Sequence, residues 1–488
     1  MFGIKISYQH SLKIKIYIVL SIIVLTGICQ EIKSQDSKTS NTKLDSVIFL
    51  SEEIYTEYCS GCHGVVIQAF VDREWEFGNS HDDLYTSISE GRSEGEMPEF
   101  GSVFNKQQIE DLVTTINHKI ENLGKYEFEE ADFNSSGIFE SEEFKFRLET
   151  IVQGLESPWG MVFLSNEDLL VTDKSGELWK IEKDGNKIEI KGVPEVLYEG
   201  QGGLLDIELH PDFSENGLLY FSYSIFKQGE KELLSSTAVS RYKLQGNELV
   251  DGELIFEALP YSDTRHHYGS RLEFDNEGYL YITVGDRGAR EVNPQSLSLS
   301  PGKVHRIYDD GGIPDDNPFV NQPDAVRSVY SYGHRNSQGM ILNPSTGKIW
   351  IHEHGPKGGD EINIITKGVN YGWPVISYGI NYDGTIFTEL TEKEGMEQPI
   401  HYWVPSIAPS GMDFVSGDFY PGWEGDLLVG SLRFENLNRC KIEGSKVLSE
   451  EILMKGIGRV RNVKQGPDGY IYVAAEEPGK IYKIIPVE

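Results

Sequence analysis

The segment "GSRLEFDNEGYLYITVGD" (269–286) contains a short apolar stretch, a polar turn and a second stretch in which apolar residues alternate. The Asp-Asn-Glu-Gly sequence is typical of a turn, and alternation at every second residue is the pattern of a β-strand. One hairpin of this kind cannot bury its faces alone, so it needs similar neighbours. The segment therefore predicts one unit of a larger antiparallel structure.

Five other segments follow the same plan, at intervals of roughly 45 to 75 residues. They are 158–173, 204–224, 339–354, 410–431 and 459–475. Six such units can close into a ring, so we expect a six-bladed β-propeller over 148–488. A β-sandwich is the structural alternative for the same strands.

Residues capable of chemistry stand where these units begin or end. They are Gln201, His266, His267, Arg271, Arg335, Asn336, Arg433, Arg459 and Arg461. Propeller loops gather at the ends of the central channel, so we expect these side chains to converge on one site. Several guanidinium groups and a histidine would suit a planar ligand with several negative charges, because arginine offers paired donors and can stack.

Eight motifs then occur in a recognisable order. They are "GQGGLLDIELHPDF", "HHYGSRL", "TVGDRG", "YGHRN", "HEHGPKGGDEIN", "NYGWP", "PSIAPSG" and "GRVRN". Over residues 148–486 the chain resembles the soluble pyrroloquinoline-quinone (PQQ) dehydrogenases of the glucose/sorbosone dehydrogenase family, and is more similar to their aldose sugar dehydrogenase branch. The resemblance implies PQQ-dependent oxidation of an aldose substrate, with Ca²⁺ bound beside the cofactor.

The resemblance also implies roles for single residues. His267 matches the catalytic base of the family. The positions that match PQQ contacts are Gln201, Arg335, Asn336, Arg433, Arg459 and Arg461. The carbonyl groups of Gly355 and Pro356 match ligands of the Ca²⁺ that holds PQQ. Asp360, Glu361 and the Tyr371 carbonyl stand where the family often has a further structural Ca²⁺.

The implied chemistry is consistent with the properties of these side chains. An imidazole of near-neutral pKa can accept the hydroxyl proton of a sugar while hydride leaves the same carbon, which is the role expected of His267. Arg335 would stabilise the negative charge that develops. Three positions depart from the glucose-oxidising branch, namely Arg433, His266 and Glu291. Glucose specificity therefore stays open.

Two alternatives accompany this interpretation. The propeller could bind carbohydrate or protein without turnover, although such a module needs no aligned base. The tripeptide "HEH" (352–354) has the composition of a zinc site, but strand alternation sends Glu353 to the face opposite the two histidines, so packing is the simpler explanation.

The N-terminal region carries a different signal. "CSGCH" (59–63) is the attachment motif of a c-type haem, in which Cys59 and Cys62 form thioethers and His63 ligates the iron. Met97, in the "MP" loop before an amphipathic helix at 106–120, suits the sixth iron position. Residues 48–122 thus resemble a small all-α class I cytochrome c. The alternatives are a zinc half-site or redox dithiol for the cysteines, and plain packing for the methionine.

The remaining segments concern location and partners. Residues 1–35 contain lysines before an apolar run, which indicates an export signal and a periplasmic protein. A buried N-terminal helix, retention of the segment as an anchor and lipidation of Cys29 are the alternatives. Residues 123–147 are acidic and predict a linker. With 44 basic against 77 acidic residues and a net charge of -33, nucleic acid is not an expected partner. A cytochrome or another respiratory-chain component is the expected electron acceptor downstream of the haem.

Overall fold

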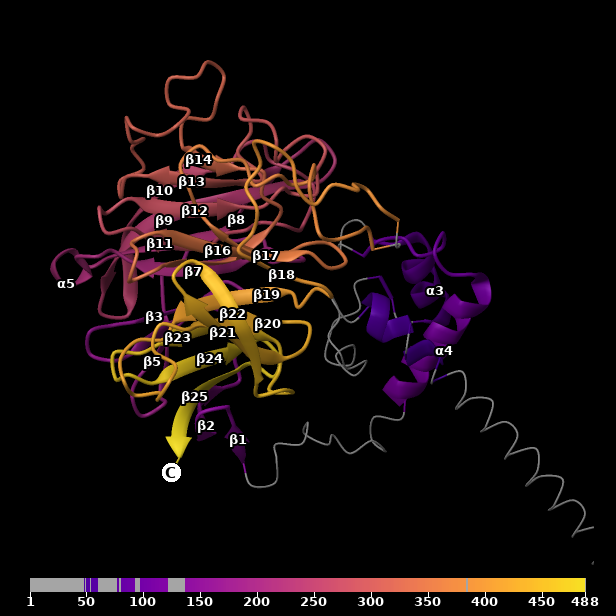
Figure 1. Cartoon of the computed structure of the whole chain (residues 1–488), viewed down its shortest axis with the longest axis horizontal. Coiled ribbons are helices and arrows are strands. Elements are labelled where there is room, and N and C mark those ends of the chain that lie inside the picture. Colours follow the sequence, from indigo (N-terminus) through magenta and orange to yellow (C-terminus); the bar gives the residue numbers. More distant parts are fainter. Residues whose placement is uncertain are drawn as a thin grey trace, which may run out of the picture.

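The computed structural model describes residues 48, 50–52, 54–59, 77–78, 80–92, 97–121, 137–382 and 385–487. A small helical part lies at the N-terminal side, and a larger part made of β-strands follows it (Figure 1). The predicted order of an all-α domain and an all-β propeller is therefore confirmed. The expected export signal lies outside the described residues. Within the described residues, no helix combines the length and apolar composition needed to cross a membrane.

Five four-stranded antiparallel sheets form the first five blades. Blade 1 contains β3 (Pro158–Phe163), β4 (Leu169–Asp173), β5 (Glu177–Ile181) and β6 (Lys187–Ile190). Blade 2 contains β7 (Leu204–Leu209), β8 (Leu218–Gln228), β9 (Leu233–Gln245) and β10 (Glu248–Glu257), with the short helix α5 (Phe213–Asn216) between β7 and β8. Blade 3 contains β11 (Leu272–Phe274), β12 (Leu280–Val284), β13 (Lys303–Ile307) and β14 (Val329–Tyr332). Blade 4 contains β15 (Ser337–Leu342), β16 (Ile349–Glu353), β17 (Asp360–Ile364) and β18 (His401–Trp403). Blade 5 contains β19 (Pro409–Phe414), β20 (Leu427–Ser431), β21 (Asn436–Glu443) and β22 (Lys446–Leu453).

The sixth blade combines both ends of the β domain. Its strands are β23 (Val460–Gln465), β24 (Ile471–Ala475), β25 (Lys480–Val487), β2 (Lys145–Gln153) and β1 (Ile138–Glu140). The first strand of each blade contacts the first strand of the next, and β23 contacts β3, so the ring closes. Apolar clusters fill the space between neighbouring blades. This arrangement excludes the β-sandwich alternative.

The prediction of a linker over 123–147 is wrong at its C-terminal end, because β1 begins at residue 138 and β2 at residue 145. Acidic residues are frequent in this segment, but Phe139, Phe144 and Phe146 pack in one apolar cluster. Phe146 is fully buried, and the ring of Phe139 stacks on it with centroids 5.6 Å apart. β2 pairs with β25, so its partner lies more than three hundred residues away in the sequence. The overall composition of the segment does not show that buried and exposed residues alternate along the start of β2.

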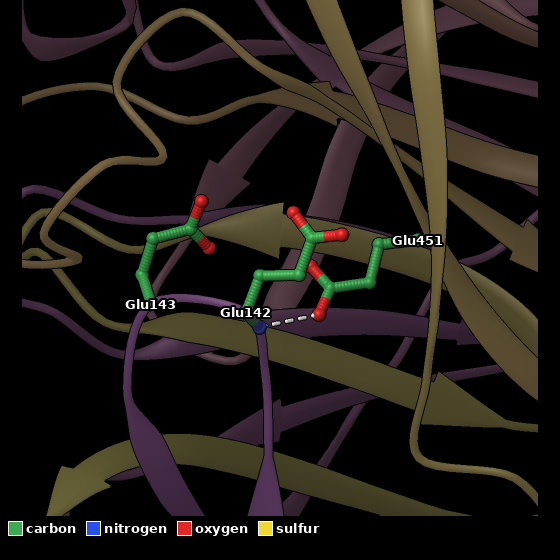
Figure 2. Close-up of side chains that lie close together, drawn as sticks. All are labelled: Glu142, Glu143 and Glu451. Carbon is green, nitrogen blue, oxygen red and sulfur yellow. Dashed lines mark hydrogen bonds between the residues drawn. The ribbon is translucent and has the colours of Figure 1, made fainter.

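Three carboxylates, Glu142, Glu143 and Glu451, lie close together where the turn between β1 and β2 meets β22 (Figure 2). Two cations of β21 form ion pairs with them. Arg439 forms ion pairs with Glu143 and Glu451, and Lys441 Nζ lies 2.8 Å from Glu142 Oε2. Hydrogen bonding from Arg439 is the main reason that the pKa of Glu143 falls to about 2. We therefore assign the cluster to an ion-pair network that fastens β1 and β2 to blade 5.

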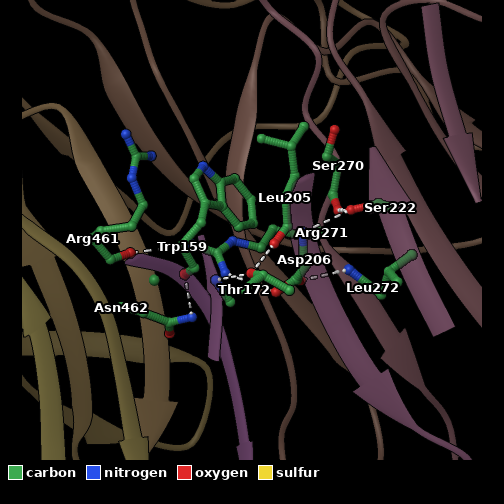
Figure 3. A network of polar contacts seen from close by, with 12 residues as sticks. Trp159, Thr172, Leu205, Asp206, Ser222, Ser270, Arg271, Leu272, Arg461 and Asn462 are labelled. Carbon is green, nitrogen blue, oxygen red and sulfur yellow. Dashed lines mark hydrogen bonds and ion pairs between the residues drawn. The ribbon is translucent and has the colours of Figure 1, made fainter. Parts of the chain in front are cut away.

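A buried guanidinium joins several blades near the propeller axis (Figure 3). Arg271, just before β11, lies over the Trp159 ring of β3 at 4.0 Å from the ring centroid. Its Nη1 lies 3.1 Å from Asp206 Oδ1 of β7, and its Nη2 donates to the Arg461 carbonyl of β23 at 3.2 Å. The sequence placed Arg271 among the converging residues, and the structure gives it partners that belong to the scaffold.

The helical part contains η1 (Tyr55–Cys59), α3 (His81–Glu90) and α4 (Lys106–Glu121). The last of these confirms the helix predicted at 106–120. α3 was not expected, because the sequence around its start is polar. The helix begins with a capping box, in which Ser80 Oγ accepts from the Asp83 N–H and the Asp83 carboxylate accepts from the Ser80 N–H. One apolar cluster joins the three helices. Its buried members are Tyr55, Leu84, Ile88, Phe100, Phe104, Ile109, Leu112, Val113 and Ile116.

Candidate active site

His267 lies in the turn before β11 with a left-handed backbone, at a φ of 54°. This conformation is uncommon for a residue with a side chain, and it persists only where the surroundings hold it. Gln201 Oε1 accepts a hydrogen bond from the His267 N–H at 3.0 Å. Gly285 is required nearby, since a Cβ there would lie 2.1 Å from the His267 carbonyl oxygen. Gln201, predicted as a PQQ contact, thus also fixes the position of His267.

Asp286 follows β12 and binds the imidazole. Its Oδ1 lies 2.6 Å from His267 Nδ1 and accepts from the Gly288 N–H at 2.9 Å. Its Oδ2 accepts from Trp373 Nε1 at 2.8 Å. Burial alone would raise the pKa of Asp286, but His267, Arg335 and the hydrogen bonds outweigh burial and lower it to about 2. An ionised carboxylate at Nδ1 keeps the proton on that nitrogen and leaves the Nε2 lone pair to act as a base.

Arg335 stands beside this pair. Its Nη1 donates to the Gly355 carbonyl at 2.9 Å, and its backbone N–H donates to Glu353 Oε2 at 2.6 Å. Burial and the Arg335 charge lower the pKa of His267, against the opposing effect of Asp286. The imidazole is therefore neutral near pH 7, as a general base must be.

The loop that carries Gly355 and Pro356 is fixed by the carboxylate of Asp360. Asp360 Oδ1 accepts from the Gly355 N–H at 2.8 Å. Gly355 itself is needed, because a Cβ there would lie 2.2 Å from the Gly358 carbonyl oxygen. Three more donors to Asp360 come from the "PSIAPSG" loop, namely Ser406 Oγ, Ile407 N and Ala408 N. These four hydrogen bonds make Asp360 a link between two loops, and its role as a Ca²⁺ ligand stays a prediction.

Glu361 is half-buried near a second carboxylate. Asn363 Nδ2 lies 3.2 Å from Glu361 Oε2 and 3.3 Å from Glu353 Oε1, and Asn363 Oδ1 is buried with no hydrogen-bond partner in the described structure. Burial, with the charge of Glu353, raises the pKa of Glu361. Tyr371 is buried beside them, stacked on His334 with ring centroids 4.7 Å apart. An unpaired oxygen and two carboxylates are a donor set that fits Ca²⁺.

The remaining predicted PQQ contacts bring positive charge to the site. Arg459 and Arg461 share one carboxylate, Glu476, at 3.5 and 2.7 Å. Arg335 donates to carbonyl groups, and Arg433 Nη1 donates to the Ser406 carbonyl at 3.1 Å. Asn336 Oδ1 accepts from the N–H of Gly269, in the turn that carries His267, at 3.2 Å. Guanidinium groups from three blades, each with paired donors, fit an anionic cofactor.

The predicted haem ligands fall partly on described residues. Cys59, the last residue of η1, and Met97 pack against the same apolar cluster of the helical part. The backbone of Met97 is held by paired hydrogen bonds with Arg92, at 2.7 and 3.0 Å. Cys62 and His63 lie outside the described residues. Cys59 and Met97 therefore share one core, while their bonds to haem stay a prediction.

Sequence reasoning did not assign Asp286 or Trp373. Both stand in quoted motifs, "TVGDRG" and "NYGWP". The available signal was an acidic residue directly after a buried strand of the unit that carries His267. Trp373 had no such signal, because its contact with Asp286 spans 87 positions of the chain. The "HEH" segment is explained by packing: His354 Nε2 lies 2.8 Å from the Pro409 carbonyl, and Glu353 lies 2.9 Å from His334.

The comparisons with known proteins match the two parts separately. Residues 155–483 match the family described as "Glucose / Sorbosone dehydrogenase", and residues 51–114 match "Cytochrome C oxidase, cbb3-type, subunit III". The chain is 40% identical over 348 residues to "Aldose sugar dehydrogenase YliI" of Escherichia coli (strain K12), covering 70% of this chain and 92% of the relative. It is 27% identical over 439 residues to "Quinoprotein glucose dehydrogenase B" of Acinetobacter calcoaceticus, covering 73% and 91%.

Solved structures agree with these relatives. The apo-form of the soluble aldose sugar dehydrogenase from Escherichia coli is similar with a TM-score of 0.67 at 38% identity, over 70% of this chain and all of that one. The PQQ-bound form of an aldose sugar dehydrogenase from Streptomyces coelicolor has a TM-score of 0.57 at 27% identity, over 71% of this chain and all of that one.

Fold, site and comparisons together define a six-bladed propeller oxidoreductase preceded by a cytochrome c domain. The chain belongs to the glucose/sorbosone dehydrogenase family.

Proposed function

We propose that the protein is a quinohaemoprotein that oxidises aldose sugars at C1 with PQQ and passes the electrons to haem c on its own cytochrome domain. The observation that carries this proposal is the partly buried His267–Asp286 pair, with the positive charge of Arg335 beside it. A module that only binds sugar needs neither an aligned base nor this positive charge. The similar proteins, which include a PQQ-bound aldose sugar dehydrogenase, support the same conclusion.

His267 performs the proton chemistry of the proposed reaction. Its Nε2 takes the proton of the C1 hydroxyl, while Asp286 holds Nδ1–H and stabilises the imidazolium that forms. Arg335 adds positive charge beside the reacting atoms and favours the neutral form of His267 before the reaction. When bound, PQQ supplies the electrophilic carbon that accepts hydride. The residues that would hold it are Gln201, Arg335, Asn336, Arg433, Arg459 and Arg461, with Ca²⁺ on the Gly355 and Pro356 carbonyl groups.

Reconstitution tests the proposal directly. The haem-loaded protein is incubated with PQQ and Ca²⁺, and an aldose panel is added while haem absorbance and reduction of a small quinone-reactive dye are recorded. We expect dye reduction with at least one aldose, and haem reduction without added dye. Absence of dye reduction with every aldose, combined with no PQQ binding, would contradict the enzyme and favour a binding propeller.

Covalent haem attachment is expected to depend on both cysteines. In the double variant Cys59→Ala/Cys62→Ala, haem should be lost from the denatured polypeptide, because no thioether can form. Sugar-dependent dye reduction should remain within about twofold, since the propeller has its own core. A haem stain on a denaturing gel and the dye assay measure the two effects. Haem that stays bound to the denatured variant would refute the assignment.

Calcium is expected to stabilise the propeller through Glu361. Calcium at about a hundred times its Kd should add about 2.7 kcal/mol to the free energy of unfolding, a rise of roughly 5 °C in Tm. Glu361→Gln should remove most of the Ca²⁺-dependent part of the rise, because it removes a charged ligand. The matched control is Glu394→Gln, an exposed acid of the long loop after β17. Equal Ca²⁺-dependent shifts in both variants would exclude Glu361 from the site.

We also propose export to the periplasm, supported by the signal-like residues 1–35 and by the haem-attachment motif. A cytochrome or another one-electron carrier of the respiratory chain would then reoxidise the haem. Fractionation of cells that produce the full chain tests the location.

A further inference from the structure

Two contacts join the predicted haem-bearing turn η1 to the propeller loops of the candidate site. Lys357 Nζ lies 3.9 Å from the centroid of the Tyr58 ring. Arg433 Nη2 donates to the Thr56 carbonyl at 3.4 Å. Tyr58 directly precedes Cys59, and Lys357 directly follows Pro356. Figure 1 shows the helical part beside the propeller on the side where the labels β17 and β18 stand.

Both sides of this contact are held by their own domains. The Tyr58 ring packs edge-on against Phe104, with ring centroids 5.0 Å apart. The Lys357 backbone pairs with Ile380, at 3.0 Å for its N–H and 3.2 Å for its carbonyl. Because the Tyr58 ring and the Lys357 backbone are each held by their own domain, a contact between them restricts how the two domains are oriented.

The charges of the two surfaces are complementary. Residues 48–122 contain 15 acidic and 4 basic residues, so the cytochrome domain is strongly negative. Lys357 and Arg433, which contact η1, are both cations, although the whole chain carries a net charge of -33. Opposite charges across an interface favour docking and fix its orientation.

We propose that Lys357 and Arg433 form a docking surface for the haem-bearing turn of the same chain, and that Lys357 is a positioning residue for electron transfer. This proposal rests on the proposed function, and it adds the path by which electrons would pass from the propeller to the haem. The route begins at Pro356, in the predicted cofactor loop, and continues to its neighbour Lys357. From Lys357 it crosses to the Tyr58 ring and ends at the adjacent Cys59, the predicted haem attachment.

The electron balance of this route needs an outside acceptor. Oxidation of one aldose releases two electrons and two protons. The haem iron takes one electron at a time, from Fe(III) to Fe(II), so a soluble one-electron acceptor must reoxidise it twice for each sugar. The protons pass to solvent.

The test uses the full-length holoprotein and the variant Lys357→Glu. After sugar is added without an external acceptor, stopped-flow absorbance should show haem reduction at least about tenfold slower than in the wild type. Dye-linked turnover should stay within about twofold. High salt should slow the wild type and leave the variant nearly unchanged, because screening acts on the same charge. Lys357→Arg should restore both the rate and its salt dependence.

The matched control is Lys348→Glu, in the exposed turn at the other end of β16. Its haem reduction should equal that of the wild type. An unchanged rate of haem reduction in Lys357→Glu would overturn the docking proposal, and so would a wild-type rate that depends on protein concentration. If dye-linked activity is retained in either case, the enzyme assignment still holds. Loss of dye-linked activity in the wild type would instead defeat the proposed function.

Docking can also be measured without turnover. Small-angle scattering of full-length protein should give a larger radius of gyration for Lys357→Glu than for the wild type and for Lys348→Glu. Identical radii at low salt would overturn the docking surface whatever the kinetics show.

Discussion

Replacing His267 with glutamine is expected to lower kcat for aldose oxidation by about 10³ to 10⁴-fold, because the C1 hydroxyl then has no base to accept its proton. PQQ binding should persist, since the guanidinium groups that would hold it are untouched. The substitution keeps a polar side chain of similar length, so a general loss of structure does not account for the effect. Dye-linked turnover and a PQQ absorbance titration measure the two properties on one sample.

The pH profile gives a second readout for His267. Burial and Arg335 lower the pKa of His267 below its ordinary value of 6.5, so the wild type should keep its neutral base, and its activity, to pH values below 6.5. A matched control is His210→Gln. His210 directly follows β7, whereas Gln201 precedes the same strand, so the two residues lie at opposite ends of β7. That variant should keep both kcat and the profile. Activity in His267→Gln within tenfold of the wild type would remove His267 from its role.

Replacing Asp286 with asparagine is expected to lower kcat by about 10² to 10³-fold. Both oxygens of Asp286 accept hydrogen bonds: Oδ1 from His267 and Gly288, and Oδ2 from Trp373. An asparagine must place its NH₂ group against one of these donors, so one bond is lost or the imidazole adopts the other tautomer. The wrong tautomer has no lone pair at Nε2.

The measurement separates a positioning role from a structural one. Asp286 raises the pKa of His267, so its removal should move the acid limb of the kcat/KM profile to lower pH while kcat falls. Asp315→Asn, at an exposed loop position, serves as the control with no expected change. A normal kcat, or a reduced kcat with lost PQQ binding and a lowered Tm, would contradict the positioning role.

The propeller could be predicted because its inner hairpins carry the strongest pattern. The six repeated segments correspond to β3–β4, β7–β8, β11–β12, β15–β16, β19–β20 and β23–β24. The side chains of these strands pack against the neighbouring blades, so apolar residues recur regularly along them. Outer strands such as β22, with the sequence "KVLSEEIL", face water and have no comparable signal.

The features that could not be predicted have one physical cause. β2 looked like linker because its partner, β25, lies at the other end of the chain. The hydrogen bonds that Asp360 accepts from Ile407 and Ala408 were not predicted, because their donors lie 47 and 48 positions further along the chain. In each case a contact between distant segments decided the role, and local composition contains no information about it.

The amino-acid sequence by itself determined the number of blades, the order of the two domains and the haem-attachment motif, because each depends on local periodicity or on a short motif. It also gave His267 as the candidate base, through the resemblance to a known family. Only the tertiary structure decided that Asp286, which accepts a hydrogen bond from Trp373, binds the His267 ring. It also decided that Gln201 bonds to the backbone of His267 and that Lys357 contacts Tyr58. These are hydrogen bonds and ring contacts between segments that meet only when the ring of blades closes, so their geometry follows from the packing of the whole chain.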